Sequence, residues 1–410
     1  MKIWIFNHYA HPPDLPGGTR HFDIGKKLIQ RGHEVVIFVS SFHHYLHKET
    51  RLQPGEQWKV EDVEGIKFVW LRTPSYQSND WRRIKNMIIF MFRARQVGMR
   101  LLSFYPEIGK PDVVIGSSPH LLTPLAAYKV AKKFRAKFVM EVRDLWPQTF
   151  IKMGEMTERN PVIKMLEILE RFLYCKAKRI IILGDNMAQY IYEKGIGEEK
   201  VVWIPNGVEF SRFNVKSISA ANQEFKILYL GAHSQTNALD TLINAAKLIQ
   251  EQGYSDISFV LIGDGPEKEN LINLASKLQL RNVNFRDAVP KNDVPWVLQE
   301  ADVLVLTKHP TFAAYSGSIL KLFDYMAAGK PIIFSGSDTY NPVDKCNCGY
   351  TIPPGSAEAL AEAIITIYKL PSSEREIIGL RGRAFVEKYH AIQVLADKVE
   401  SLLKDVVQDY

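Results

Sequence analysis

The sequence predicts an α/β protein with two domains, each built around a doubly wound, parallel sheet. Short apolar runs alternate with amphipathic segments of helical length, and the runs are nearly continuous, as in strands covered on both faces. The chain has 410 residues, of which 46% are hydrophobic and 24% charged. That length favours two hydrophobic cores over one.

The N-terminal half has the spacing of βαβ units, and we expect the first domain to span residues 1–208. Its apolar runs are KIWIFNH, HEVVIFVSS, IKFVWLRT, DVVIGSS, AKFVMEV, RIIILGD and KVVWIPN. Ligands of parallel sheets gather at the carboxyl ends of the strands. The candidate site residues are therefore sought directly after these runs.

The first candidate is a glycine pair before a helix that we expect Thr19 to open, in PGGTRHFDIGKKL. Gly17 and Gly18 would let the backbone approach a diphosphate or an acceptor closely, and Arg20 adds a fixed cation in the first turn. The alternative is an ordinary turn. The pattern lacks the spacing G-x-G-x-x-G with a later acidic residue, which disfavours a nicotinamide cofactor.

Two further strand ends carry unusual side chains. His120, in GSSPHLLTP, is a candidate for orienting a hydroxyl, with a helix-capping or surface role as the alternative. Glu141, Arg143 and Asp144, in MEVRDLWPQ, follow an apolar strand. Because an unpaired buried charge is costly, these three residues either line a cleft or pair with one another.

Residues 302–336 form the unit around which the second domain is organised: a buried strand, a small-residue loop, a short helix and another buried strand. We expect Ser318 to cap the helix and Gly329 to end it. Lys321 and Asp324 lie one turn apart below the loop Ser316, Gly317 and Ser318, whose backbone N–H groups would attract a phosphate. The alternative for Lys321 and Asp324 is an ordinary surface pair.

The run SGSILKLFDYMAAGKP resembles the signature of the family 4 retaining glycosyltransferases, which have the GT-B fold of two Rossmann-like domains facing a cleft. This resemblance implies transfer from a UDP-sugar, without a metal or other cofactor. Asp324 matches a family glutamate that contacts the nucleotide ribose, whereas Ser316 replaces one that contacts the sugar. The runs FDYMAAGKP and EVRDLWP are similar to those of bacterial N-acetylfucosamine transferases.

Other positions depart from the family pattern. Relatives commonly place an Arg and a Lys in the loop GAHSQTNALDTL, where this chain has Ala232 and Asn237. His233, backbone N–H groups and Lys321 would then supply the positive field for the diphosphate. Arg143 stands where many relatives carry a histidine, so the role of that histidine is not transferred to it.

The polar stretch 209–224 is the expected linker between the domains. A second domain is predicted at 225–389, with strand FKILYLGAH at its start and helices at 372–389 and 391–407 near the end. By the resemblance, the segment 390–410 returns to the first domain.

The composition indicates the cellular compartment and disfavours a disulfide framework and a metal site. Cys175, Cys346 and Cys348 are too few for a disulfide framework, and a metal site on Cys346 and Cys348 is disfavoured because no matching ligand cluster is present. The N-terminus has no apolar leader and no run is long enough to span a membrane, which predicts a cytoplasmic protein. No nucleic-acid motif accompanies the net charge of +7.

Residues 81–100 have six basic residues around an apolar centre. We weigh a helix lying at the inner membrane surface against a core helix with basic ends. The predicted activity is sugar transfer from a UDP-sugar to a hydroxyl of a lipid-linked or glycan acceptor, with an N-acetylated sugar, in cell-surface polysaccharide synthesis. The alternatives are a nucleotide-sugar 2-epimerase of the same fold and a non-catalytic membrane scaffold.

Overall fold

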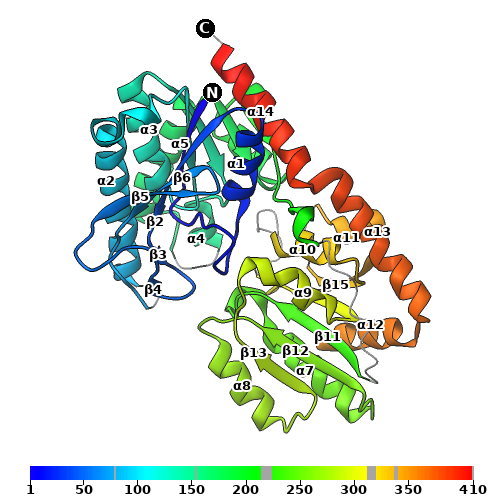
Figure 1. Ribbon diagram of the computed structural model, residues 1–410. Coiled ribbons are helices and arrows are strands. Elements are labelled where there is room, and N and C mark those ends of the chain that lie inside the picture. Colours follow the sequence, from blue (N-terminus) through cyan, green and yellow to red (C-terminus); the bar gives the residue numbers. More distant parts are fainter. Residues whose placement is uncertain are drawn as a thin grey trace. The chain divides into compact units, whose positions relative to one another are not determined.

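The computed structural model confirms the α/β fold and divides the chain into two compact units (Figure 1). It describes residues 1–77, 80–152, 154, 156–213, 224–311, 320–336 and 340–408. Unit 1 comprises Met1–Pro13, Gly17–Pro205 and Ile392–Tyr410, and unit 2 comprises Asp14–Pro16 and Asn206–Ala391. The division at 205/206 lies close to the expected end of the first domain at 208.

Unit 1 contains an eight-stranded sheet in the order β10-β9-β8-β7-β1-β2-β6-β5. Its strands are β1 (Lys2–Phe6), β2 (Glu34–Ser40), β5 (Trp58–Val63), β6 (Ile66–Leu71), β7 (Val113–Ser117), β8 (Lys137–Val142), β9 (Arg179–Ile182) and β10 (Val201–Trp203). All neighbours are parallel except β5 and β6. A small antiparallel ribbon, β3 (Phe42–His43) and β4 (Lys48–Glu49), follows β2.

The antiparallel pair β5 and β6 departs from the purely parallel sheet that the apolar runs predict. Glu64 and Gly65 join the two strands, and both have positive φ, at 52° and 88°. Two residues of positive φ make the turn whose twist suits a hairpin. Strand β5 lies at the edge of the sheet and is only partly buried, so it lacks the apolar run that marks the other strands.

Helices cover both faces of the unit 1 sheet. One face packs against α1 (Arg20–Gln30) and α14 (Ile392–Gln408). The other packs against α2 (Trp81–Phe104), α3 (Leu122–Phe134), α5 (Pro161–Lys176) and α6 (Met187–Glu193), and the short α4 (Gln148–Lys152) follows β8. Glu400 on α14 accepts from Arg31 at 2.8 Å and contacts His33 at 2.9 Å, which fixes the last helix to this unit.

Unit 2 has a six-stranded, entirely parallel sheet in the order β13-β12-β11-β14-β15-β16. The strands are β11 (Phe225–Leu230), β12 (Ile257–Ile262), β13 (Val283–Arg286), β14 (Val303–Thr307), β15 (Ile332–Ser335) and β16 (Gly349–Ile352). One face packs against α7 (Leu239–Glu251), α8 (Lys268–Lys277) and α12 (Ala357–Lys369). The other packs against α9 (Val294–Gln299), α10 (Leu320–Ala328), α11 (Pro342–Cys346) and α13 (Ser372–His390).

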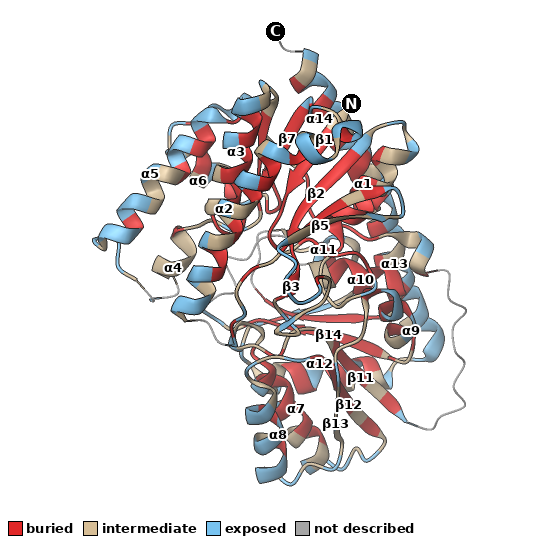
Figure 2. Cartoon of the chain, turned by 60° about the vertical axis from the view of Figure 1, so that its left-hand side comes forward, coloured by how far each residue is buried: buried red, intermediate tan, exposed pale blue. Residues whose placement is uncertain are grey.

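Strand order places a topological switch point in each sheet. In unit 1, β1 lies between β2 and β7, and in unit 2, β11 lies between β12 and β14. Strands are therefore added on both sides of β1 and of β11. The carboxyl ends of the strands at such a point form the usual ligand crevice of an open α/β sheet. Figure 2 shows that these strands are buried along their length.

One buried carboxyl gives the fold a pH-dependent stability. Glu170 on α5 has no exposed surface and accepts hydrogen bonds from Tyr174 Oη and Tyr190 Oη, both at 2.9 Å. Burial raises the pKa of Glu170 to about 7, although the two hydroxyls oppose this shift. The folded state therefore retains a proton that the unfolded chain releases near pH 4.5.

We expect Glu170→Gln to remove this dependence. The wild-type free energy of unfolding should fall relative to that of the variant by about 3 kcal/mol as pH rises from the unfolded pKa to the folded one. Urea unfolding of both proteins across this range, followed by tryptophan fluorescence, measures the difference. Parallel pH profiles would show that Glu170 titrates normally.

Candidate active site

Lys321 lies at the switch point of unit 2, below the loop that follows β11. Its Nζ donates to Tyr229 Oη at 2.8 Å and to Asn237 Oδ1 at 3.0 Å. A Cβ on Gly231 would lie 2.6 Å from Lys321 Cδ, and a Cβ on Gly263 would lie 1.9 Å from Gly231 O. Both glycines are therefore required for the lysine and the two strand ends to approach one another this closely.

The ammonium of Lys321 is surrounded by neutral oxygens in its hydrogen bonds. Desolvation, and secondarily the charge of Lys308, lowers the pKa of Lys321 to about 7. Lys308, itself buried, directly follows β14 and lies over the Phe334 ring at 5.5 Å. Two lysines thus converge where the carboxyl ends of β11 and β14 meet, an arrangement that favours an anion.

Sequence reasoning missed Lys308, although its position directly after an apolar strand was a usable signal. It also missed Lys291, which forms a buried ion pair with Asp324. Lys321 and Asp324 consequently do not form the surface pair considered as an alternative, because each reaches a different partner. The helix end at Gly329, with φ of 70°, is confirmed.

The loop after β11 is held by its own hydrogen bonds. Asn237 donates to Ala232 O and to Ser234 Oγ, both at 2.8 Å, so the residue at the family's lysine position presents its carbonyl oxygen to Lys321. His233 is fully buried, and burial followed by the charge of Lys268 lowers its pKa to about 4. A neutral imidazole adds no formal charge, so the positive field at the described loop ends comes from lysines, among them Lys321 and Lys308.

Three predicted donor-binding residues cannot be placed. Ser316, Gly317 and Ser318 lie in 312–319, outside the described residues, as does the expected helix cap at Ser318. Helix α10 is described from Leu320 onwards.

In unit 1, Glu141 is the centre of a buried network at the carboxyl ends of β7 and β8. It accepts from Arg20 Nε at 2.9 Å and from Ser117 Oγ at 2.8 Å, and it contacts His21 Nε2 at 2.8 Å. Burial alone would raise the pKa of Glu141, but the charges of Arg20 and His21 outweigh it and hold the pKa well below its usual range. The carboxylate is therefore ionised and paired.

Arg20 continues this network to the end of unit 1. Besides Glu141, its guanidinium donates to Ile204 O at 2.9 Å and to Pro205 O. Arg20 is thus fixed at the start of α1, and its contact with donor phosphates stays a prediction. Glu141 pairs with Arg20 and His21 of α1, and neither the expected cleft lining nor the expected mutual pairing describes this buried carboxylate.

His120 is buried at the switch point of unit 1, so its surface alternative is wrong. His120 Nε2 lies 2.8 Å from Nδ1 of His8, which lies two residues after β1, and 3.3 Å from Thr123 Oγ1. Burial lowers the pKa of His120 to about 3 and that of His8 well below its usual value. Both imidazoles are neutral, and each can donate or accept one hydrogen bond per ring nitrogen.

More aromatic rings extend this pair, and sequence reasoning missed them. His11 stacks on His43 with ring centroids 4.4 Å apart, and Tyr9 lies 4.8 Å from His44. These residues follow β1 and β2 and were detectable as polar residues directly after apolar strands. The described part of the chain holds no group of three or more His, Cys, Asp or Glu side chains suited to a metal ion.

The remaining predicted residues of unit 1 surround this region. The backbone N–H of Arg143 donates to Ser118 Oγ at 2.8 Å, its side chain is half-buried, and Asp144 is exposed. Gly17 has φ of 131°, which favours glycine, and it precedes Gly18 and the confirmed start of α1 after Thr19.

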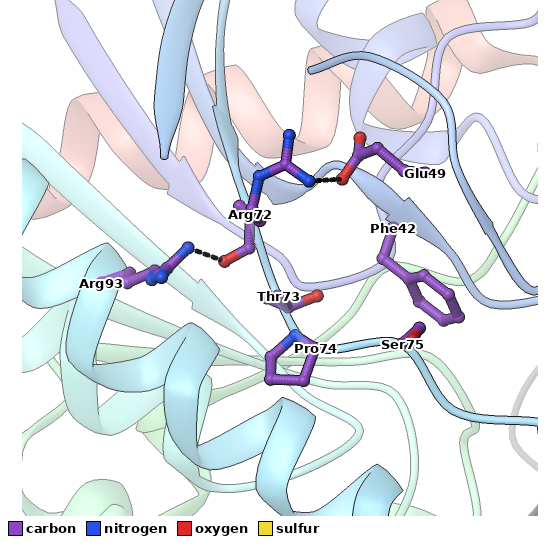
Figure 3. A pocket seen from close by; sticks show the side chains of 7 residues that line it. All are labelled: Phe42, Glu49, Arg72, Thr73, Pro74, Ser75 and Arg93. Atoms are coloured by element: carbon purple, nitrogen blue, oxygen red, sulfur yellow. Dashed lines mark hydrogen bonds and ion pairs between the residues drawn. The ribbon is translucent and has the colours of Figure 1, made fainter. Parts of the chain in front are cut away.

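A pocket of about 390 Å³ opens beside the carboxyl end of β6 (Figure 3). Phe42, Glu49, Arg72, Thr73, Pro74, Ser75 and Arg93 line it. Its two guanidinium groups are bound within the protein: Arg72 donates to Gln53 O at 2.6 Å, and Arg93 donates to Gln57 Oε1 at 2.6 Å. These arginines stabilise the walls of the pocket.

Helix α2 confirms the helical prediction for residues 81–100 but divides its apolar centre. Met87 and Phe90 are buried in the core, whereas Ile88 and Phe92 are exposed. Among the described residues, no helix is both long and apolar enough to cross a membrane.

Two family models match successive parts of the chain. The model described as "Glycosyl transferase 4-like domain" matches residues 17–207, and that described as "Glycosyl transferases group 1" matches residues 211–385. Between them they cover both units.

Curated relatives and solved structures agree with these models. WcaI of Escherichia coli, named for glycosyl transfer in colanic acid biosynthesis, is 23% identical over 90% of this chain and 93% of its own. CapM of Staphylococcus aureus, named as a capsular polysaccharide biosynthesis glycosyltransferase, is 24% identical over 75% of this chain and 80% of its own.

Sucrose-phosphate synthase of Thermosynechococcus elongatus has a TM-score of 0.74 at 17% identity, covering 98% of both chains. Anabaena HepE, solved with UDP and glucose, has a TM-score of 0.69 at 15% identity, covering 98% of this chain and 99% of its own. At these identities the structures establish the fold. The two family models, which together match residues 17–207 and 211–385, show that the chain belongs to the glycosyltransferases, with a family 4-like first domain and the GT-B fold.

Proposed function

We propose that the protein transfers a sugar from a UDP-sugar, with retention of configuration, to a hydroxyl of a lipid-linked or glycan acceptor in cell-surface polysaccharide synthesis. The sugar is N-acetylated, as in the N-acetylfucosamine transferases that the sequence resembles. The enzyme works in the cytoplasm at the inner face of the membrane. A relative supports the acceptor class, since its name specifies UDP-Gal as donor and GlcNAc-diphosphoundecaprenol as acceptor.

The observation that carries this proposal is the pair of lysines at the switch point of unit 2. Breaking the bond between the sugar and the diphosphate leaves negative charge on the phosphate oxygens, and stabilising that charge is the main catalytic requirement. Neutral groups hold Lys321, and burial lowers its pKa. A bound diphosphate would favour the protonated lysine and so restore its full charge. Protein cations then meet the leaving group without a metal.

The other predicted contacts fit around this centre. Asp324, positioned by Lys291, accepts hydrogen bonds from the ribose hydroxyls. The predicted phosphate contact of Ser316, Gly317 and Ser318 lies outside the described residues and stays a prediction. On the acceptor side, the neutral pair His8 and His120 offers donor and acceptor nitrogens to a hydroxylated substrate.

The proposal is tested by incubating the protein with radiolabelled UDP-sugars, with and without a membrane extract. Transfer requires the extract as a source of acceptor, whereas a 2-epimerase would convert UDP-N-acetyl sugars alone. A scaffold would do neither. Label that appears in lipid only when extract is present supports transfer, and absence of label with every UDP-sugar would contradict it.

We expect Lys321→Met to weaken UDP binding by roughly 10- to 100-fold, because a charge-assisted contact contributes about 1.5–3 kcal/mol. Lys321→Arg should retain more of the affinity, since it keeps the charge. Isothermal titration calorimetry measures both, and circular dichroism verifies folding. Unchanged UDP affinity in a folded Lys321→Met protein would remove this lysine from the donor site.

The depressed pKa of Lys321 predicts a pH-dependent affinity. Lys321 loses its proton in the free protein as pH rises through about 7, while bound diphosphate favours the charged form. UDP affinity should therefore fall by up to about tenfold per pH unit between about pH 7 and pH 9, and the protein should take up a proton when UDP binds.

Titrations in buffers of different ionisation enthalpy measure that proton uptake. Lys321→Arg should show a flat profile over the same range, because a guanidinium stays charged. Asn237→Asp should move the decline to higher pH, because a carboxylate beside Nζ raises the pKa of the lysine. A flat wild-type profile would contradict a titrating lysine at the site.

A further inference from the structure

Helices α2, α3 and α5 form one layer over a single face of the unit 1 sheet, with α3 in contact with both of its neighbours (Figure 1). Their inner residues share one hydrophobic core with the strands. The outer sides of all three helices therefore face away from the sheet on the same side of the unit. We refer to this outer side as the helical face.

Charge on these helices is strongly one-sided. They contain twelve Lys or Arg residues, of which Arg93 is bound at the pocket beside β6, and two acidic residues, Glu167 and Glu170. Glu170 is buried against tyrosines, and Glu167 contacts Lys194. The helices thus carry more positive charge than the net +7 of the whole chain, so the rest of the chain is net acidic.

Large apolar side chains are exposed on two of these helices. On α2 and α5 they recur at helical spacing, which places them in a row along each helix: Trp81, Ile84, Ile88 and Phe92 on α2, and Val162, Met165, Ile168 and Phe172 on α5. Phe92 is 54% and Ile168 is 73% exposed. Between the two rows, α3 exposes Lys129, Lys132 and Lys133.

The combination of apolar rows with surrounding cations identifies the partner. A second copy of this chain on the same face would bring two basic surfaces together, which costs free energy. A nucleic acid would satisfy the cations but leave eight apolar side chains without contacts. An anionic bilayer accommodates both, since apolar side chains enter the acyl boundary while Lys and Arg meet the lipid phosphates.

We infer that the helical face of α2, α3 and α5 is the surface by which the protein docks on an anionic lipid bilayer. This inference extends the single helix 81–100 to a three-helix surface and rests on the proposed function, because a lipid-linked acceptor is held in a membrane. Docking is peripheral: the apolar side chains form rows on amphipathic helices and do not make a spanning segment.

Co-sedimentation of the full-length protein with vesicles tests the inference. Vesicles of phosphatidylcholine mixed with phosphatidylglycerol should bind the protein, and vesicles of phosphatidylcholine alone should bind at least tenfold less. Raised salt should weaken binding, because screening removes the electrostatic attraction. The double variant Phe92→Glu and Ile168→Glu should lose at least tenfold in vesicle affinity.

A matched control lies on α13 in unit 2, where Ile377 and Leu380 are 52% and 49% exposed. The double variant Ile377→Glu and Leu380→Glu adds the same charge and should bind vesicles as the wild type does. Equal loss in both double variants would overturn the inference, as would failure of the wild type to bind anionic vesicles. A solution dimer that only Phe92→Glu and Ile168→Glu dissociates would assign the face to a second copy instead.

UDP affinity of the same variants separates this inference from the proposed function. Soluble UDP needs no membrane, so Phe92→Glu and Ile168→Glu should bind UDP unchanged. Normal UDP binding without vesicle binding would refute docking alone, whereas vesicle binding without UDP binding would refute the donor site alone.

Discussion

The site in unit 2 depends on placing a lysine ammonium between strand ends, where water is largely excluded and its hydrogen-bond partners are neutral. Gly231 leaves the space that the side chain of Lys321 occupies, Gly263 lets the neighbouring strand end approach Gly231, and Tyr229 and Asn237 supply the oxygens that hold the lysine. A carboxylate at either position would partly neutralise the ammonium and weaken the attraction for an anion. The same constraint explains why Asn237 suits this chain: with a lysine there, a third cation would be added to Lys308 and Lys321.

The two units use the same topological position in different ways. At the strand ends of unit 1, the carboxylate of Glu141 is compensated by Arg20 and also contacts His21, so this pairing stabilises the fold and orients α1. The nearby histidines remain neutral. At the strand ends of unit 2, Asp324 is compensated by Lys291, while the partners of Lys321 among the described residues, Tyr229 and Asn237, are uncharged. The contrast is consistent with an anionic donor in unit 2 and an uncharged hydroxyl at the histidines of unit 1.

The sequence predicted most of the fold because the apolar runs, the glycine after α10 and the strand-helix alternation are local signals. It failed for β5, whose edge position leaves it without an apolar run. The partners of the charged side chains were harder to predict from the sequence than the positions of the helices and strands. Asp324 meets a lysine 33 residues away and Glu141 meets an arginine 121 residues away, and neither spacing follows from periodicity. Lys308 and His8 were detectable because polar residues that follow apolar strands commonly line a crevice, but neither residue belongs to the family motif.

Helix α10 also connects the site to the first and last segments of unit 2. Lys321 and Asp324 point to the strand ends, while Phe323, on the same helix, stacks on His390 with ring centroids 4.1 Å apart. His390 contacts Asn206 O at 3.1 Å, and its carbonyl accepts from Val208 N at 3.0 Å, so it joins the first and last segments of the unit. Phe323 and Lys321 lie on the same nine-residue helix, so the stacking of Phe323 on His390 helps to fix the helix that carries Lys321. The packing of Phe323 therefore matters to the site although its side chain is directed away from it.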